Sequence, residues 1–373
     1  MKTLLLVAGS RAGSEFFQSL FDGHPEVLQF PGNSITSKKQ IESISLDNPN
    51  EIVSNFIKNR LHFFDSRVGE GKIERYDRLG ENKDRYFLVD KEKFKINFLH
   101  IFEKEFKNNY NNKLHQIILM LHQAYAKTCG HDISKKKIMI INTHEIEFTR
   151  YIAKKINNVD FDIIHTIRNP LSSISSSVNN WIRYDRGKHF FAKSIYFQLD
   201  LIVNGIKQLK KINKKIFLVQ LEMLHKNHFE VMKDFCNTYN LEYKNCLKFS
   251  TFFDLKWWGD KVSGKDLNGI NKDFKITFNE KIFYNRDIKF LEYIMKDYII
   301  FYGYKFTTET SKVIYNLLPM KCELVTWINS IKHKKIKHIL SIPFFYFKRL
   351  FYVNKYSQKN LKMPHSFGLN LKK

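Results

Sequence analysis

Residues 9–14, Gly-Ser-Arg-Ala-Gly-Ser, combine a guanidinium group, two glycines and hydroxyl groups directly after an apolar run. Gly13 lets the main chain approach a ligand closely, Arg11 adds a positive fork, and the Ser14 hydroxyl can donate a hydrogen bond. N–H groups at the start of a following helix would favour the same negative charge. The stretch matches neither GxxxxGK[ST] nor GxGxxG. It predicts an anion cradle suited to phosphate, with a plain strand-to-helix turn as the alternative.

A second stretch, residues 168–176, reads Arg-Asn-Pro-Leu-Ser-Ser-Ile-Ser-Ser and also follows an apolar run. Pro170 suits the first turn of a helix. Arg168 falls where a sheet strand should end, which is where open α/β sheets bind ligands. Ser176 lies just over two helical turns beyond Arg168 and so returns to the same side. The spacing predicts that the two residues share one anion. The alternative is a serine-rich helix start with a structural salt bridge.

Apolar runs alternate with helical patterns around these stretches. Strands are predicted over residues 3–8, 137–142, 161–167 and 216–220. Helices are predicted from Ser14 to about Asp22 and over residues 51–64, 94–106, 114–127, 147–155, from 171 onward, 229–238 and 284–302. This alternation implies an α/β fold with a mostly parallel central sheet and helices on both faces. No run reaches the ~18 apolar residues that a membrane-spanning helix needs.

The composition leaves the meaning of the positive charge open. The chain has 373 residues and a formal charge of +25, and only 12 of its 62 basic residues are arginine. Sites that bind phosphate through two hydrogen bonds favour arginine over lysine. The lysine surplus therefore fits a coding bias as well as an anionic partner. Cys129, Cys236, Cys246 and Cys322 form no CxxC pair. Their scatter disfavours a zinc site or a disulfide framework and fits a reducing compartment such as the cytoplasm.

The character of the chain changes near residue 306, so we predict two parts, residues 1–305 and a helical, basic extension over residues 306–373. Within the extension, residues 331–356 mix lysines and histidines with a run rich in phenylalanine and tyrosine. Basic residues mixed with aromatic ones suit peripheral contact with a membrane or another anionic surface. The alternative is a helix that docks its aromatic face on the main domain.

Taken together, the two arginine-containing stretches resemble the sulfotransferase superfamily. In that family, a 5′-phosphosulfate loop reading Lys/Arg-Ser-Gly-Thr follows the first strand. Arg11, Ala12, Gly13 and Ser14 stand in that place, with Ala12 instead of serine and Ser14 instead of threonine. Ser14 keeps the hydroxyl group, so we expect binding to survive the change.

The family's 3′-phosphate motif is Arg-Asp/Asn-Pro with a serine eight residues after the arginine. Residues 168–170 and Ser176 match it at every position. The resemblance covers about residues 1–305 and implies a P-loop-like α/β fold. It also implies that the chain binds the donor 3′-phosphoadenosine 5′-phosphosulfate, with Arg168 and Ser176 on the 3′-phosphate.

Asn142-Thr143-His144-Glu145, at the end of the second long predicted strand, is similar to the Lys-Thr-His of the cytosolic-type sulfotransferases. The family's histidine is the general base, so the resemblance implies that His144 removes the proton of the acceptor hydroxyl. Histidine suits this role because it changes protonation near neutral pH. Asn142 replaces the family's lysine. Other branches use a glutamate base, so Glu145 is an alternative, and a purely structural histidine is another.

In this superfamily a late basic loop closes over the 3′-phosphate, and residues 257–265 resemble such a loop, with Lys265 in that role. The paired tryptophans Trp257 and Trp258 would equally suit stacking on a sugar ring or an adenine. The alternative is an exposed loop anchored by tryptophan packing.

The resemblance implies a sulfotransferase that moves a sulfuryl group to an acceptor hydroxyl, with a glycan or glycolipid as the favoured acceptor. Arg11 would stabilise the charge that develops during transfer. No metal is expected, because a sulfuryl group carries less charge than the phosphoryl group that Mg²⁺ usually accompanies. The alternatives are a P-loop-like nucleotide kinase, a non-enzymatic nucleic-acid binder and a protein of anionic membrane surfaces. We expect no specific nucleic acid.

Overall fold

The computed structural model describes residues 1–9, 11–35, 37–45, 47–106, 112–183, 191–261, 266–274, 282–307, 318–332, 336–340 and parts of 343–351. The chain divides into two compact units. The first unit comprises Met1–Ala8, Gly13–Thr166 and Lys211–Phe274, and the second comprises Gly9–Ala12, Ile167–Lys210 and Lys275–Lys373. The division after residue 305 that the sequence suggests stays a prediction.

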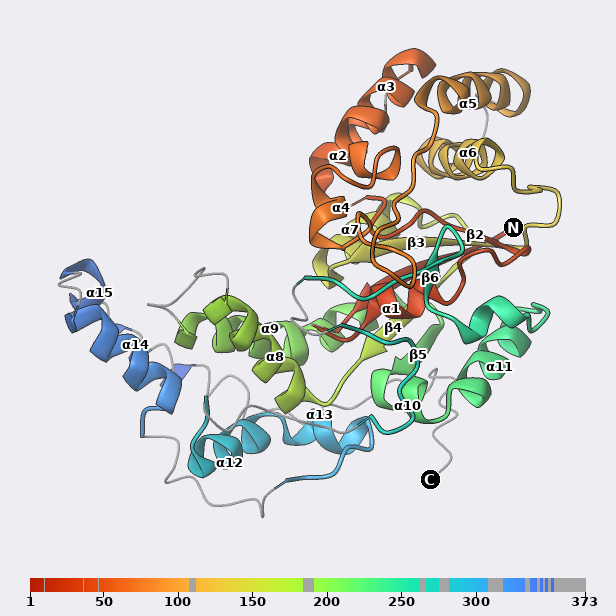
Figure 1. Ribbon diagram of the computed structural model, residues 1–373. Helices are drawn as coiled ribbons and strands as arrows, with labels where there is room; N and C mark the ends of the chain where they lie inside the picture. Colours follow the sequence, from red (N-terminus) through yellow and green to blue (C-terminus); the bar gives the residue numbers. More distant parts are fainter. Residues whose placement is uncertain are drawn as a thin grey trace. The chain divides into compact units, whose positions relative to one another are not determined.

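A five-stranded sheet forms the centre of the fold, with the strand order β2-β3-β1-β4-β5 (Figure 1). The strands are β1 (Lys2–Ala8), β2 (Val27–Leu28), β3 (Ile138–His144), β4 (Phe161–Ile167) and β5 (Ile216–Gln220). β1 pairs in parallel with both β3 and β4, and β2 pairs in parallel with β3. The predicted α/β class with a parallel central sheet is therefore confirmed.

The strands are apolar runs buried on both faces, which is typical of parallel sheets. Residues 3–8 of β1 and all seven residues of β4 are buried. A separate hairpin consists of β6 (Thr251–Phe252) and β7 (Leu255–Lys256), which pair antiparallel. The sequence pattern predicts the four long strands to within two residues at each end. It does not predict β2, β6 or β7, since two residues are too short to show a period.

The helices of the first unit are α1 (Ser14–Ser19), α2 (Lys38–Ile44), α3 (Pro49–Asn59), α4 (Glu70–Ile73), α5 (Lys91–Glu105), α6 (Lys113–Thr128), α7 (Ile146–Lys155), α10 (Leu221–Lys226) and α11 (His228–Thr238). Two short 3₁₀ helices, η1 (Leu61–Phe63) and η2 (Asn245–Lys248), accompany them. Asp90 caps α5 by accepting hydrogen bonds from the N–H groups of Glu92 and Lys93, and Asn112 caps α6 through the N–H of His115.

The phenylalanine-rich composition supplies the packing between helices of the first unit. Phe30 stacks on Phe63 at 5.1 Å between ring centroids, and Tyr125 of α6 lies 4.7 Å from Phe30. Phe56 of α3 and Phe94 of α5 join the same cluster. α5 and α6, which carry Phe94 and Tyr125, lie side by side (Figure 1). Aromatic packing thus joins helices of this part of the chain. The predicted helix over residues 51–64 is divided into α3 and η1, and the sequence pattern does not predict α2 or α4.

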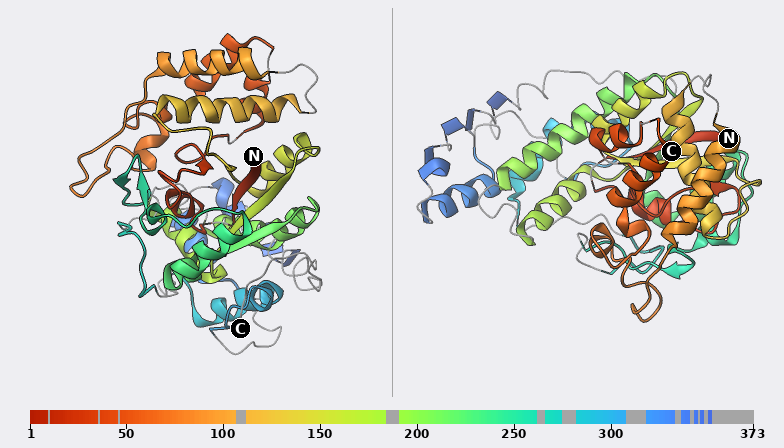
Figure 2. Two further views of the ribbon diagram at one scale, coloured as in Figure 1. Left: turned by 90° about the vertical axis from the view of Figure 1, so that its right-hand side faces the viewer. Right: turned by 90° about the horizontal axis from the view of Figure 1, so that it is seen from above.

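The second unit contains α8 (Pro170–Arg183), α9 (Phe191–Lys210), α12 (Asn285–Ile294), α13 (Lys296–Phe301), α14 (Lys321–Lys332) and α15 (Ile336–Leu340). α8 and α9 lie side by side (Figure 2). The predicted helix over residues 284–302 is interrupted at Met295 and forms α12 and α13. None of the described helices is long and apolar enough to cross a membrane.

The predicted helix from Ser14 to Asp22 is also shorter than expected. α1 ends at Ser19, and the N–H groups of Phe21 and Asp22 then bond to carbonyls three residues back. These shorter hydrogen bonds form a tighter helical turn just before Gly23, where the chain changes direction. Gly23 has a φ of 68°, which only glycine adopts readily.

Candidate functional site

The carboxyl ends of three strands lie next to one another in the first unit. The register of the parallel pairs places Ala8 of β1 opposite Thr166 of β4, and Val7 opposite His144 of β3. The residues that follow Ala8, Thr166 and His144 along the chain therefore leave the sheet at neighbouring positions. All three stretches that the sequence singles out, residues 9–14, 142–145 and 168–176, begin at this edge.

The strand order gives this edge a second property. From β1 the chain proceeds through α1 to β2 and β3 on one side of β1, whereas β4 and β5 lie on the other side. The connections after β1 and β4 thus run in opposite directions. In open α/β sheets such a change of direction leaves a crevice outside the carboxyl ends, where ligands bind.

The first loop has the backbone that close ligand approach requires. Gly13, the residue before α1, has a φ of 74°, and Arg11 has a positive φ of 49°. A Cβ atom on Gly13 would lie 2.7 Å from Cδ1 of Leu221. Ala12 and Ser14 are 1% and 4% exposed, so both residues are buried beside Gly13. Because α1 has only six residues, its dipole adds less than the sequence suggests.

The second loop begins a helix in the way the sequence predicts. The Asn169 side chain accepts a hydrogen bond from the N–H of Ser172, and Pro170 is the first residue of α8. Ser176 is half-buried and remains accessible on α8. The four neighbouring serines, by contrast, are only 1–3% exposed: Ser172, Ser173, Ser175 and Ser177. The accessible hydroxyl of this cluster is therefore the one at the eight-residue spacing from Arg168.

Two of the predicted anion-binding residues, Arg11 and Arg168, belong to the second unit together with Ser176. Both arginines are half-buried, and both make interactions within the protein. Gly13 and Ser14 belong to the first unit, as does His144.

His144 stands at an irregular end of β3. The parallel register skips one residue there, so that Leu6 faces Asn142 and Val7 faces His144. His144 has a φ of 58° and is exposed. Bulges of this kind re-aim side chains and are common next to active sites. His144 is thus open to solvent at the edge where the loops begin.

Asn142 has a structural role. Its side chain is 1% exposed, donates to Oε1 of Gln18 at 2.8 Å and accepts from the N–H of His144 at 3.1 Å. It therefore ties α1 to the end of β3 and holds the backbone of His144 in its left-handed conformation. Glu145 directly precedes α7, is exposed, and its carbonyl accepts from the N–H of Thr149.

The tryptophan loop is anchored by packing. Trp257 is 3% exposed, and its indole N–H donates to the carbonyl of Glu74 at 2.7 Å. The indole N–H of Trp258 donates to Gly80, and the ammonium groups of Lys83 and Lys256 lie 4.5 and 4.1 Å from its ring. Buried Trp257 is therefore unavailable for stacking on a ligand. Lys265, predicted to reach the 3′-phosphate, lies outside the described residues.

Three carboxyl groups that the sequence does not single out meet in the first unit. Oxygen atoms of Glu15, Glu74 and Asp260 lie within 4.8 Å of one another, close enough to hold a metal ion. Burial, followed by the charge of Glu15, raises the pKa of Glu74 well above its ordinary value. These residues come from distant parts of the chain, so no sequence pattern reveals their proximity.

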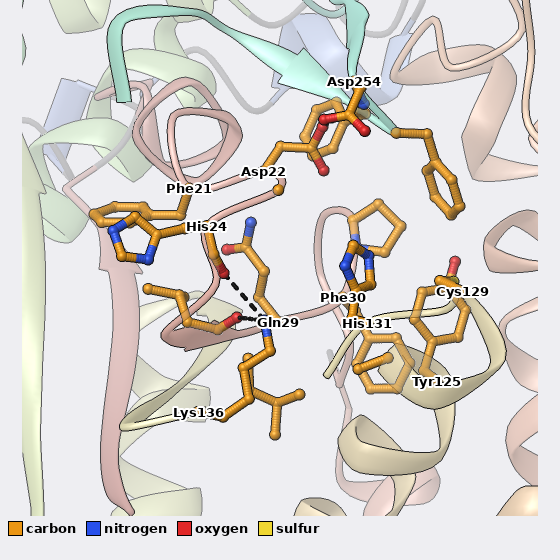
Figure 3. A pocket seen from close by; sticks show the side chains of 17 residues that line it. Phe21, Asp22, His24, Gln29, Phe30, Tyr125, Cys129, His131, Lys136 and Asp254 are labelled. Atoms are coloured by element: carbon orange, nitrogen blue, oxygen red, sulfur yellow. Dashed lines mark hydrogen bonds between the residues drawn. The ribbon is translucent and has the colours of Figure 1, made fainter. Parts of the chain in front are cut away.

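A cavity of about 140 Å³ lies past the carboxyl end of α1 (Figure 3). Its walls include the aromatic rings of Phe30 and Tyr125. Asp22 accepts a hydrogen bond from the N–H of Asp254 at 2.8 Å, and burial raises the pKa of Asp22 to about 6. Lys136 donates to two backbone carbonyls at 3.0 and 2.8 Å (Figure 3). These polar groups hold the β6–β7 hairpin and neighbouring segments in place.

No family model and no curated protein matches the chain. Among solved structures, it is similar to the sulfotransferase STF9 from Mycobacterium avium (11% identity, TM-score 0.40, covering 83% of this chain and 79% of the other). It is also similar to the sulfotransferase domains of the curacin biosynthetic pathway (14%, 0.39, 88% and 98%) and of the Synechococcus PCC 7002 olefin synthase (11%, 0.35, 74% and 84%). The inferences below rest on the loops and the strand order.

Proposed function

We propose that this protein is a sulfotransferase that moves a sulfuryl group from 3′-phosphoadenosine 5′-phosphosulfate to an acceptor hydroxyl. The observation that carries the proposal is the register of β1 with β4, Ala8 opposite Thr166, which starts both arginine-containing loops from neighbouring strand ends. The strand order changes direction between the same two strands. The residue patterns of the two loops are features of the sequence alone and do not depend on this register. That both loops begin at the same edge of the sheet therefore supports a ligand bound by both.

In this proposal the donor is held at both ends. The backbone around Ala12 and Gly13, with Arg11 and the Ser14 hydroxyl, binds the 5′-phosphosulfate. Arg168 and Ser176 bind the 3′-phosphate and so select this donor over ATP. A guanidinium fork suits a phosphate geometrically, and a serine hydroxyl adds one donor.

The reaction needs one bond to form and one to break. The acceptor oxygen attacks sulfur in line, the new O–S bond forms, and the bond between sulfur and the bridging phosphate oxygen breaks. His144 takes the acceptor proton, and 3′,5′-adenosine bisphosphate leaves with the electron pair. Positioning and the charge of Arg11 near the bridging and equatorial oxygens supply most of the rate enhancement.

We propose a glycan or glycolipid hydroxyl as the acceptor. The exposure of His144 supports a large acceptor, because solvent reaches this residue in the part of the chain that the structure describes. A small phenol or alcohol would gain little from so open an edge, since small-molecule sites usually surround their ligand.

The test is transfer of labelled sulfate from the donor into a panel of glycans, glycolipids and phenols, with and without EDTA. We expect transfer that is retained in EDTA and lost in Arg168→Ala. Labelled phosphate transfer from ATP that requires Mg²⁺ would instead favour the kinase. Absence of transfer, together with steeply salt-dependent binding of nucleic acid, would favour a nucleic-acid binder and overturn the proposal.

A further inference from the structure

Large apolar side chains are exposed at regular intervals in the last described part of the second unit. Five of them are 63–74% exposed: Ile336, Leu340, Phe344, Phe347 and Phe351. Their spacing is four, four, three and four residues, which is the period of one helix face. α15 covers the first two, and each of the phenylalanines is itself helical. These residues, Ile336 to Phe351, are called the apolar stripe below.

Two more exposed apolar side chains lie near the end of α14, where Ile328 and Ile331 are 61% and 57% exposed. Exposed apolar side chains are ordinary when they occur singly, as Ile96 does at 66% on α5. A continuous series at helical spacing differs, because it keeps one face of a segment apolar over several turns. Docking of an aromatic face on the main domain, the alternative sequence interpretation, stays a prediction.

The surrounding charge has one sign. After Glu323 the remaining 50 residues contain no aspartate or glutamate, and they contain ten lysines and one arginine. Lys332, at the end of α14, is exposed among them. Lysines combined with exposed isoleucine, leucine and phenylalanine are the composition of segments that lie in the surface of an anionic bilayer.

We propose that the segment from Ile328 to Phe351 binds the surface of a bilayer containing anionic lipids, with the apolar stripe inserted between the headgroups. The aliphatic residues favour a membrane over a nucleic acid, because phosphate contacts need no isoleucine or leucine at the interface. The preference for lysine over arginine fits diffuse attraction to a charged surface. The inference does not depend on the proposed transfer reaction.

The test uses the full-length chain and vesicles of phosphatidylcholine, alone or mixed with the anionic lipid phosphatidylglycerol, because lysines near an anionic surface contribute to binding. We expect the chain to bind the anionic vesicles at least about tenfold more tightly than the vesicles of phosphatidylcholine alone. We also expect this binding to require the apolar stripe. The double variant Phe344→Glu/Phe347→Glu should lose about tenfold or more of that binding. Both side chains are exposed, so folding, followed by circular dichroism, should be unchanged.

Ile96→Glu is the matched control, since it replaces an equally exposed apolar residue on α5 in the other unit. It should bind anionic vesicles like the unsubstituted chain. Three outcomes would overturn the proposal: no binding of the unsubstituted chain to anionic vesicles, equal binding by the double variant, or equal loss in the Ile96→Glu control. If single-stranded RNA displaces the chain from the vesicles, and the double variant binds as tightly as the unsubstituted chain, the segment binds nucleic acid instead.

Discussion

The molecule carries positive charge in two regions that are built differently. At the carboxyl edge of the sheet the charge comes from Arg11 and Arg168, each placed directly after a buried strand. After Glu323 it comes from ten lysines and one arginine on a segment with exposed apolar residues. Arginine side chains suit one anion of defined shape, whereas a series of lysines attracts negative charge diffusely.

The difference predicts that the two regions can be separated by mutation. Changes at the sheet edge should alter donor binding and turnover and leave vesicle binding unchanged. Changes in the last segment should do the reverse when a soluble acceptor is used.

The largest effect is expected from Arg168→Ala. Loss of a charge-assisted contact to a bound phosphate should weaken donor binding by at least about 100-fold, because a buried phosphate oxygen is left unpaired. Calorimetric titration measures this, and vesicle sedimentation of the same variant should match the unsubstituted chain. Arg67→Ala is the control, since Arg67 is exposed, pairs with Asp65 and lies over the ring of Tyr86, outside the two loops. Equal losses in both variants would remove the special role of Arg168.

His144→Ala should lower kcat by about 100-fold, the usual contribution of a general base. The dissociation constant of the donor should change by no more than about twofold, because the base contacts the acceptor. Single-turnover rates and donor titration separate the two quantities. Near-normal turnover would mean that another group is the general base. Glu145→Gln would then be the variant to measure.

Gly13→Ala should lower the free energy of unfolding by about 1–2 kcal/mol, because alanine is strained at a φ of 74°. Gly130→Ala is the control for this backbone strain. Gly130 has a φ of 83°, and a methyl group added there would contact nothing within 4 Å. Donor affinity should fall in Gly13→Ala alone, since only Gly13 lies in the first loop. Equal donor affinity in the two variants would show that close approach to Gly13 is not needed.

The smallest effect is expected in the last segment. Lys332→Ala should weaken binding to anionic vesicles by roughly fivefold, since one basic residue near such a surface contributes about 1 kcal/mol. Turnover with a soluble acceptor should be unchanged. Lys39→Ala, which removes an exposed lysine from α2, is the control for total charge. An equal decrease in the control would mean that net charge, and not this segment, brings the protein to the vesicle.

The sequence predicts those features that a contiguous stretch determines. β4 and β5 begin and end at the predicted residues, because each is an apolar run bounded by polar ones. The start of α8 is also predicted, since Asn169 and Pro170 carry the local signals of a helix start. By contrast, α5 begins three residues earlier than predicted, because its start depends on the cap at Asp90.

Features that depend on distant segments are not predicted. The skipped residue before His144 depends on how β3 pairs with β1, and the carboxyl cluster around Glu74 requires three separate segments to meet. The tryptophan loop illustrates the same limit. A ligand-stacking role for Trp257 is compatible with its sequence, and only its burial and its bond to the carbonyl of Glu74 assign it to packing.

Calorimetric titration of the unsubstituted protein with 3′,5′-adenosine bisphosphate and with adenosine 5′-monophosphate tests the central claim most directly. Because the two ligands differ only in the 3′-phosphate, their difference reports the contribution of Arg168 and Ser176. We predict that the bisphosphate binds at least about 100-fold more tightly, and that Arg168→Ala removes most of this difference. Equal affinities in the unsubstituted protein, or binding of neither ligand, would contradict the account.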